Sequence, residues 1–261
     1  PAMVGVLRQA ARAAQSDASV LLLGESGTGK EIVAQYIHQH SPYRKKQMVA
    51  INCTSLPESL LEAELFGYEK GAFTGAASGG KIGLIEAAAN NTLLLDEVNS
   101  MPLSLQAKLL RVLETKAVIP VGSVKPRAVN FRLICASNVA LAQCVKEGTF
   151  RMDLYYRLNV IPITIPPLRE RREDITPLAD YFLDHFCQKY GLQKEFSSRV
   201  YQILNHYKWP GNIRELRNLV EHMVVMSESS VVKINQIPTG MLQLEPPSPE
   251  SGPECLNEEY L

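Results

Sequence analysis

Short runs of apolar residues recur along the first two thirds of the chain. They cover Ser19–Leu23, Met48–Ile51, Thr92–Leu95, Phe131–Ala136 and Val160–Ile165. Each run is continuous rather than alternating, which is typical of strands that are buried on both faces of a parallel sheet. We therefore expect an α/β protein with a parallel sheet between two layers of helices, an αβα sandwich.

Segments with helical periodicity separate several of these runs. Two sets of apolar residues each predict one face of a helix: Ile32, Val33, Tyr36 and Ile37, and Leu105, Leu109, Val112 and Leu113. Both faces are expected to pack on the sheet. The nearby residues His38 and His40 are expected to be solvated near the end of the first helix.

After Pro166 and Pro167 the strand pattern stops and helical periods follow. The apolar positions are Ile175, Leu178, Phe182 and Phe186, then Val200, Ile203 and Leu204, then Ile213, Leu216, Val220 and Met223. Asn212 with Glu215 three residues later predicts the capped start of the last helix. We expect an αβα domain over residues 1–170, a smaller helical domain over 171–241 and, from its Pro, Ser and Glu content, a flexible tail over 242–261.

Composition excludes several classes of protein. The 261 residues are 46% apolar and carry no formal net charge, so the chain lacks the basic surface that drives tight DNA binding. No apolar run reaches the roughly 18 residues of a membrane span. The five cysteines have no metal-site or redox spacing. We expect a cytoplasmic globular protein without a membrane segment.

The strongest chemical pattern is the glycine-rich segment Gly24-Glu25-Ser26-Gly27-Thr28-Gly29-Lys30, which fits G-x-x-x-x-G-K. It follows a predicted strand and precedes a predicted helix, which is the context of a phosphate-binding P-loop. Glycines let the backbone N–H groups point at phosphate oxygens, and Lys30 adds a full charge. Glu31 stands where the pattern has the Ser or Thr that contacts Mg²⁺, so the metal is expected to depend on another carboxylate or on water.

Asp96 can supply that carboxylate, and a second acid, Glu97, follows it directly. They end the apolar run Leu93-Leu94-Leu95, which is the form of a Walker B strand. Asp96 is expected to hold Mg²⁺ directly or through water, and Glu97 to orient the water that attacks the phosphate. Without the phosphate loop, two solvated acids at a strand end would be the simpler interpretation.

Together with the segment Gly71-Ala72-Phe73-Thr74-Gly75-Ala76, these patterns make the chain resemble the central domain of sigma-54-dependent transcriptional activators. The sequence GAFTGA is close to unique to that family. Further similar stretches are Glu64–Lys70, Met101–Leu113, Asp153–Val160 and Trp209–Leu216. The glycines at positions 67, 71, 75, 79, 80 and 83 independently favour a mobile loop.

The resemblance implies an AAA+ P-loop NTPase fold with a helical lid, and ATP and Mg²⁺ as cofactors. It implies an enzyme that hydrolyses ATP to remodel the closed promoter complex of the sigma-54 RNA polymerase holoenzyme. The GAFTGA loop of the enzyme would contact sigma-54. By the same resemblance Asn52 switches Glu97 between poses, Asn138 after Ser137 senses the γ-phosphate and Arg214 couples nucleotide to the lid.

Arg151 and Arg157 match the arginine fingers that complete the ATP site of a neighbouring subunit, so the resemblance implies a homo-oligomeric ring, hexameric or heptameric. Fingers of this kind contribute roughly 10³–10⁵ in rate. Three positions depart from the family's usual residues: Met152 replaces an acid, Asn90-Asn91 replaces two glycines and Asn99-Ser100 replaces Gly-Asp. We expect altered rates or assembly rather than lost activity.

Three other functions remain open at this point. The first is a chaperone-like AAA+ remodeller with Phe73 on a threading loop. The second is a regulator that binds nucleotide without hydrolysis, and the third is a metabolic P-loop kinase. The family's signal-sensing domain and DNA-binding helix-turn-helix are absent from this chain, which predicts an excised central module.

Overall fold

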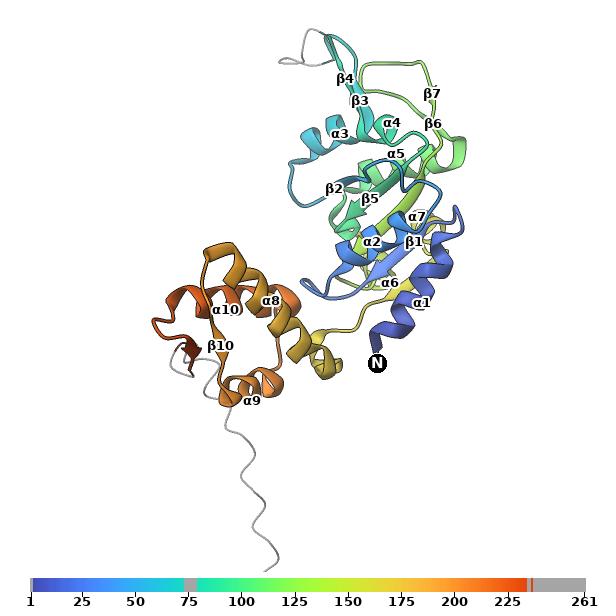
Figure 1. The fold of residues 1–261 in the computed structure, drawn as a ribbon. Coiled ribbons are helices and arrows are strands. Elements are labelled where there is room, and N and C mark those ends of the chain that lie inside the picture. The colour runs from blue at the N-terminus through green and yellow to red at the C-terminus, as the bar shows by residue number, and fades with distance from the viewer. Residues whose placement is uncertain (1, 73–78, 234–235, 237–261) are drawn as a thin grey trace, which may run out of the picture. The chain divides into compact units, whose positions relative to one another are not determined.

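The computed structural model describes residues 2–72, 79–233 and 236. The chain forms two compact units, Pro1–Arg171 and Arg172–Leu261 (Figure 1). The first contains the large sheet, and the second is mainly helical. No helix among the described residues is long and apolar enough to cross a membrane.

The first unit is built on a five-stranded parallel sheet with the strand order β2-β5-β8-β1-β9. The strands are β1 (Val20–Leu23), β2 (Val49–Asn52), β5 (Thr92–Asp96), β8 (Arg132–Ser137) and β9 (Ile161–Thr164). All four pairings are parallel. The five apolar runs therefore form the five strands that the sequence predicts.

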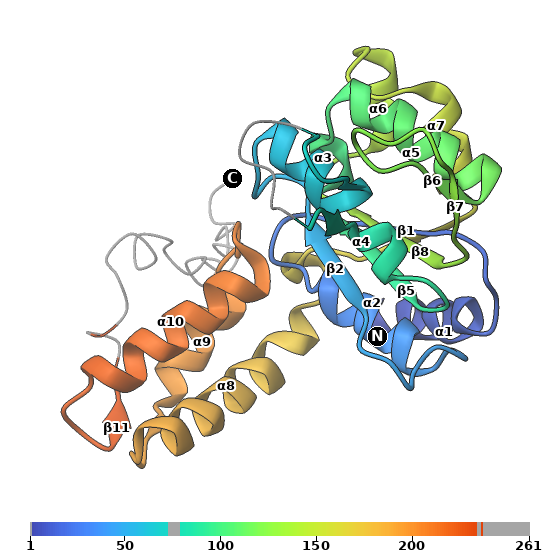
Figure 2. The same cartoon turned by 90° about the horizontal axis from the view of Figure 1, so that it is seen from above.

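Successive strand residues face opposite sides of the sheet, and each side has its own helical layer. Val20, Leu22 and Ile134 pack toward α1 (Ala2–Ala14) and α2 (Lys30–Gln39). Leu21 and Leu133 pack on the other side toward α3 (Glu58–Phe66), α4 (Leu84–Ala87), α5 (Leu103–Thr115), α6 (Leu141–Lys146) and α7 (Met152–Leu158). Figure 2 shows α1 and α2 on one side of the strands and α5, α6 and α7 on the other. The predicted αβα sandwich is confirmed.

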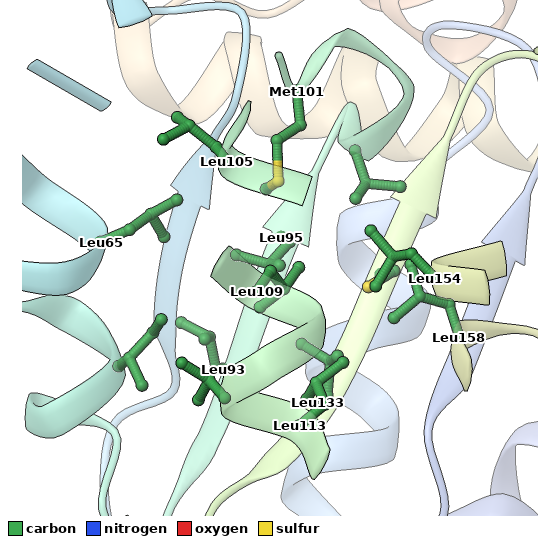
Figure 3. Close-up of a cluster of buried hydrophobic side chains, with 14 of the residues drawn as sticks. Leu65, Leu93, Leu95, Met101, Leu105, Leu109, Leu113, Leu133, Leu154 and Leu158 are labelled. Carbon is green, nitrogen blue, oxygen red and sulfur yellow. The ribbon is translucent and has the colours of Figure 1, made fainter. Parts of the chain in front are cut away.

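The larger core lies under α5. Leu105, Leu109 and Leu113 recur on one face of that helix and belong to one buried cluster with the leucines of β5 and β8, which Figure 3 shows. All three are buried, and burying a leucine side chain contributes about 1.5–3 kcal/mol. This layer fixes β5, whose last residue is Asp96, and thereby one side of the site described below.

Ile32 corrects the predicted face of the first helix. Val33 and Ile37 are buried against the sheet, but Ile32 is 67% exposed. Four apolar residues within six positions span more of the helix than the sheet covers, because each residue advances the face by about 100°. Ile32 therefore lies outside the core.

Two small hairpins extend from the same unit. β3 (Gly67–Tyr68) pairs with β4 (Lys81–Ile82), and β6 (Ala117–Val118) pairs with β7 (Arg127–Ala128), both antiparallel. The first hairpin is the stem of the segment that contains GAFTGA.

The second unit consists of three helices and two very short strands. The helices are α8 (Ile175–Tyr190), α9 (Ser198–His206) and α10 (Asn212–Met226). Unexpectedly, β10 (Glu195–Phe196) and β11 (Val231–Val232) form a parallel pair, so the expectation that strands end with the first unit is wrong. Two-residue strands leave no periodic signal in a sequence.

The start of α10 differs from its prediction by one residue. Gly211, not Asn212, occupies the cap position. Glu215, four residues after Gly211, accepts a hydrogen bond from the Gly211 N–H at 2.8 Å, which satisfies a backbone donor at the helix start. The acid of the predicted capping pair therefore closes the helix start, whereas Asn212 is buried as its first residue.

Candidate functional site

The predicted site residues that lie on the strands or directly after them meet at one edge of the sheet, because parallel strands end on the same side. Asn52 and Asp96 are paired in the register of β2 and β5. The N–H of Gly24, directly after β1, donates to the carbonyl of Ser137 at the end of β8, at 3.2 Å. Four strands thus deliver the phosphate loop, Asn52, the acidic pair and Ser137-Asn138 to one place.

The phosphate loop has the backbone that its glycines predict. Gly27 and Gly29 take φ values of 78° and 99°, which side chains with a Cβ rarely adopt. A Cβ on Gly24 would lie 2.7 Å from the carbonyl oxygen of Ile165. The loop leads directly into α2, whose first residue is Lys30, so the positive end of a helix dipole faces the loop.

Lys30 is 7% exposed and lies inside this loop. Its Nζ donates to the carbonyl oxygens of Gly24 at 2.8 Å and Glu25 at 3.2 Å. The same nitrogen lies 3.9 Å from Oε1 of Glu97. Thr28 closes the loop, because its hydroxyl donates to the Glu25 carbonyl at 2.8 Å.

The acidic pair is held in a defined geometry. The amide of Asn52 donates to Oδ2 of Asp96 at 3.3 Å, and the N–H of Glu97 donates to Oδ1 of Asp96 at 3.0 Å. Glu97 itself has a left-handed backbone, with φ 53° and ψ 44°. This conformation is uncommon for a residue with a side chain and costs of the order of 1 kcal/mol. It is the kind of strain that concentrates at functional sites.

The arrangement suits a magnesium ion shared with phosphates. Among the described residues, no group of three or more His, Cys, Asp or Glu could hold a metal. Mg²⁺ commonly binds one or two carboxylates plus waters and phosphate oxygens, so Asp96 is a sufficient protein ligand. Glu31 is exposed and accepts from Gln35 at 3.5 Å, at the limit of a hydrogen bond. The residues therefore fit Mg²⁺ bound together with a nucleotide.

Ser137 is a buried link between β8 and the turn after β5. Its hydroxyl oxygen lies 3.0 Å from Oδ1 of Asn99 and 2.7 Å from the carbonyl oxygen of Val139, and its one proton can be donated to either acceptor. The departure at Asn99 thus makes a specific contact in the site. Asn138, the next residue, is exposed at the edge where the strands end.

The backbone explains why asparagine can replace the family's usual glycine at position 90. Asn90 has a φ of 53°, and asparagine is among the few residues with a Cβ that tolerate this left-handed region. Replacing a glycine by asparagine here therefore preserves the turn before β5.

Arg151 and Arg157 lie at α7 and are exposed. Arg157 donates to the carbonyl of Leu113 at 3.2 Å, and Arg151 forms two hydrogen bonds with Asp153. Within the described residues neither guanidinium contacts Lys30, Asp96 or Glu97. Asp153 supplies Arg151 with a carboxylate despite the departure at Met152.

Arg214 lies in the first turn of α10 and is exposed. It belongs to the second unit, whereas the phosphate loop belongs to the first.

The GAFTGA segment falls partly outside the described residues. Gly71 and Ala72 are described, and Phe73, Thr74, Gly75 and Ala76 are not. The stem below them is tightly built: a Cβ on Gly83 would overlap the backbone of Phe66 and Gly67. At Gly67 and Gly83 the glycines are therefore required by close backbone packing, which corrects their interpretation as mobility signals.

Three polar residues of the first unit have surroundings or contacts that the sequence does not predict. His38 is 5% exposed and hydrogen-bonds Thr92 and the carbonyl of Lys46, so the expectation that it is solvated is wrong. Arg171 is 2% exposed and donates to the carbonyl of Thr28 at 2.8 Å. Arg169 binds both carboxylate oxygens of Glu25. No periodicity predicts these long-range contacts.

Cys53 lies beside the acidic pair. Its N–H donates to the carbonyl of Asp96 at 2.9 Å. Burial first, and then the charges of Asp96 and Glu97, raise the pKa of the Cys53 thiol to about 12. The thiol is therefore protonated at neutral pH.

A cavity of about 650 Å³ lies away from this edge, lined by residues of α3 and α5 and by the segment 117–126. None of the predicted nucleotide-binding residues lines it.

Comparison with known proteins agrees with the fold described above. Residues 1–164 match the Sigma-54 interaction domain and residues 169–253 match the AAA+ ATPase lid domain. The chain is 48% identical to the regulatory protein AtoC of Escherichia coli over 93% of its own length and 53% of AtoC. It is 48% identical to the nitrogen fixation protein VnfA of Azotobacter vinelandii over 92% of its length and 46% of VnfA.

Solved structures show the same fold. NtrX from Brucella abortus matches with a TM-score of 0.86 at 32% identity, covering 94% of this chain and 56% of NtrX. NtrX has also been solved in complex with ATP, and that structure matches with a TM-score of 0.84 at 33% identity, covering 92% of this chain and 55% of NtrX. This chain spans about half the length of AtoC, VnfA and NtrX, and 40% of the Escherichia coli regulator UacR.

Proposed function

The chain belongs to the sigma-54 interaction domain family and has the AAA+ P-loop NTPase fold with a helical lid, and from this premise we propose that it hydrolyses ATP to remodel RNA polymerase carrying sigma-54. The product would be an open promoter complex. The observation that carries the proposal is the convergence of Lys30, Asp96 and Glu97 on one phosphate loop. This set contains the cation and both carboxylates that phosphoryl transfer to water needs.

Each group has a separate task in the proposed reaction. The N–H groups of the loop and the ammonium of Lys30 bind the β- and γ-phosphates of ATP. Asp96 would hold Mg²⁺, which when bound supplies positive charge against the phosphate oxygens. Glu97 orients a water molecule toward the γ-phosphate and accepts its proton as the P–O bond to ADP breaks. Asn52 fixes the orientation of the Asp96 carboxylate through their hydrogen bond.

Three further residues are proposed to read the nucleotide, by similarity to the family. Asn138 would contact the γ-phosphate, because it follows Ser137 at the edge where the strands end. Arg214 would contact the nucleotide from the lid. Asn52 would also alternate between Asp96 and Glu97 as the nucleotide changes.

Arg151 and Arg157 are proposed to act on the ATP of a neighbouring subunit. Both are exposed and their hydrogen bonds within the described chain go to α5 and α7. Met152 and Tyr156 beside them are 61% and 68% exposed, which gives α7 an apolar surface that a second subunit would cover. A ring of six or seven copies would place one pair of arginines at each site.

The GAFTGA segment, residues 71–76, is proposed as the contact with sigma-54. The match to the family motif is complete at all six positions. The stem below it is joined to the segment 117–128: the N–H of Glu69 donates to the carbonyl of Val121 at 3.0 Å, and Arg127 binds both Glu69 and Glu86. Motion of the core would therefore reach the base of this segment directly.

The first test measures ATP hydrolysis per subunit against protein concentration with Mg²⁺ present. We expect the rate to rise steeply with concentration for the native chain and to fall at least 10³-fold in Arg157→Ala, as for other arginine fingers. Arg8→Ala, an exposed arginine on α1, is the matched control. Turnover that is independent of concentration and unaffected by Arg157→Ala would contradict a site shared between subunits.

The second test concerns the partner. With a transition-state analogue of ATP bound, the chain should co-elute with sigma-54, and Thr74→Ala should abolish co-elution while leaving ATP hydrolysis intact. Open-complex formation that survives Thr74→Ala would refute the proposed role of residues 71–76. Unfolding of unrelated proteins would favour a chaperone-like activity instead.

A further inference from the structure

Two arginines that follow β9 form hydrogen bonds with the phosphate loop. β9 runs beside β1, with Thr164 paired to Leu23, so the chain leaving β9 passes the loop that leaves β1. A short helical turn, Leu168–Glu170, follows, and Leu168 is fully buried. This turn places Arg169 and Arg171 within hydrogen-bonding distance of the loop.

Arg171 contacts the peptide group between Thr28 and Gly29 in the loop. Its Nη2 donates to the carbonyl oxygen of Thr28 at 2.8 Å, and the side chains of both residues are almost fully buried. The N–H of the same peptide group belongs to Gly29, which has a φ of 99°. Glycine in this region allows the peptide plane to rotate easily. A buried charged donor on its carbonyl opposes that rotation.

The hydrogen bond has an electrostatic effect as well. A donor that polarises a peptide carbonyl strengthens the N–H on the other side of the same peptide as a donor. The Gly29 N–H lies directly before Lys30 and α2, where N–H groups bind phosphate in P-loops. Arg171 therefore affects both the direction and the strength of one donor.

Arg169 holds the first half of the loop through a side chain. Its two terminal nitrogens donate to the two carboxylate oxygens of Glu25 at 2.8 and 2.6 Å. Both side chains are about 40% exposed, so this pair is weaker than the buried contact of Arg171. The Glu25 carbonyl in turn accepts hydrogen bonds from Lys30 and from the Thr28 hydroxyl.

Resting on the proposed ATP binding, we propose that Arg171 is a positioning residue of the nucleotide site, which holds the carbonyl of Thr28 outward so that the Gly29 N–H faces the phosphates. Arg169 supports the same loop through Glu25. Neither arginine touches the nucleotide in this proposal. Their effect is on affinity rather than on the chemical step, because a preformed cradle binds without first being ordered.

The test is the dissociation constant of a fluorescent ATP analogue, measured without Mg²⁺ so that no turnover occurs. Arg171→Met removes the donor and keeps the bulk, and we expect affinity to fall about ten- to hundredfold, the effect of losing a charged hydrogen bond. Arg171→Lys keeps a charge and one donor and should recover affinity to within about fivefold of the native value. Arg172→Met, at the exposed neighbouring position, should bind like the native chain.

A steady-state comparison separates positioning from general damage. In Arg171→Lys the KM for ATP should rise while kcat stays within about twofold. Native-like affinity in a folded Arg171→Met protein would overturn the proposal. A native chain that does not bind the analogue would overturn the proposed function itself, and with it this inference.

If Arg171→Met fails to fold, variants of the exposed ion pair between Arg169 and Glu25 test the proposal instead. Arg169→Gln and Glu25→Gln should each weaken binding about threefold, and the double variant no further, because both remove one interaction. Native affinity for the ATP analogue in both single variants and in the double variant would overturn the proposal.

Discussion

The Oε1 atom of Glu97 lies 3.9 Å from Nζ of Lys30, at the point where β5 ends and α2 begins. The side chains are 14% and 7% exposed, so the ion pair is largely shielded from water. The left-handed backbone of Glu97 turns the chain at the end of β5. One acid is thereby placed against the phosphate loop, while its neighbour Asp96 is held by Asn52.

Glu97→Gln should separate ATP binding from hydrolysis. The substitution keeps the shape of the side chain and removes its ability to accept a proton from water. We expect kcat to fall about 10²–10⁴-fold, the usual contribution of a general base, while affinity for the ATP analogue stays within about threefold. The measurement is phosphate release and analogue binding on the same samples.

The control for this variant is Glu114→Gln, which changes an exposed acid on α5 and should leave both quantities unchanged. Hydrolysis by Glu97→Gln at more than a third of the native rate would remove Glu97 from its proposed role.

Gly83→Ala should destabilise the stem of the GAFTGA segment. A Cβ at this position would overlap the backbone of Phe66 and Gly67 and would lie 2.5 Å from the carbonyl oxygen of Leu65. Backbone atoms cannot move aside as a flexible side chain can, so we expect a loss of about 1–3 kcal/mol in the free energy of unfolding. Urea denaturation followed by circular dichroism measures it.

Gly79→Ala is the matched control, because a Cβ at Gly79 has nothing within 4 Å. It should change the free energy of unfolding by less than about 0.5 kcal/mol. Equal stability of the two variants would mean that the stem adapts more readily than its packing indicates.

Cys53 should be inert toward thiol reagents in the folded protein. With its pKa raised to about 12, the reactive thiolate is scarce at pH 8. Cys187, which is only partly buried, should react with iodoacetamide before Cys53 does, and peptide mass mapping distinguishes the two sites. Labelling of Cys53 as fast as Cys187 would show that the region beside Asp96 opens readily.

The raised pKa of the Cys53 thiol also predicts that the free energy of unfolding depends on pH. The native state keeps the Cys53 proton at a pH at which the unfolded chain, with its ordinary thiol pKa near 9, releases it. The contribution is complete below about pH 9 and is lost as the pH rises toward 12. Cys53→Ala should therefore flatten the decline in the free energy of unfolding over this range.

Much of the fold follows from the chain's own pattern. Continuous apolar runs are typical of strands buried in a parallel sheet, and the carboxyl ends of parallel strands meet at one edge. The convergence of Gly24, Asn52 and Asp96 therefore follows from their places at the ends of strands. The glycine pattern of the phosphate loop predicts left-handed backbone at glycines, and Gly27 and Gly29 adopt it. These features are local, and local rules predict them.

The residues whose burial the sequence does not predict share one physical cause. Arg171 stands in a run of six charged residues, which by itself predicts solvent exposure, yet it is buried because a distant loop offers it a carbonyl. His38 is buried because Thr92 lies beside it. Such residues acquire their surroundings from segments far along the chain, and no window of sequence contains both partners.

His38 offers the most direct measurement of such a long-range contact. Its Nδ1 lies 2.9 Å from the Thr92 hydroxyl and its Nε2 lies 2.7 Å from the Lys46 carbonyl. A carbonyl only accepts, so Nε2 carries the proton, and in the neutral ring Nδ1 accepts from Thr92. The histidine thereby joins the end of α2, which begins at the phosphate loop, to the start of β5, which ends at Asp96.

A double-mutant cycle with His38→Phe and Thr92→Val should detect this coupling. Each single change leaves a buried polar group without its partner and should lower the free energy of unfolding by about 1–3 kcal/mol. The double variant should cost less than the sum by at least about 0.5 kcal/mol, since it removes both partners of one bond. His40→Phe, at an exposed position on the same turn, should cost little. Strict additivity would show that His38 and Thr92 stabilise the unit independently, and that α2 and β5 are joined by their apolar packing alone.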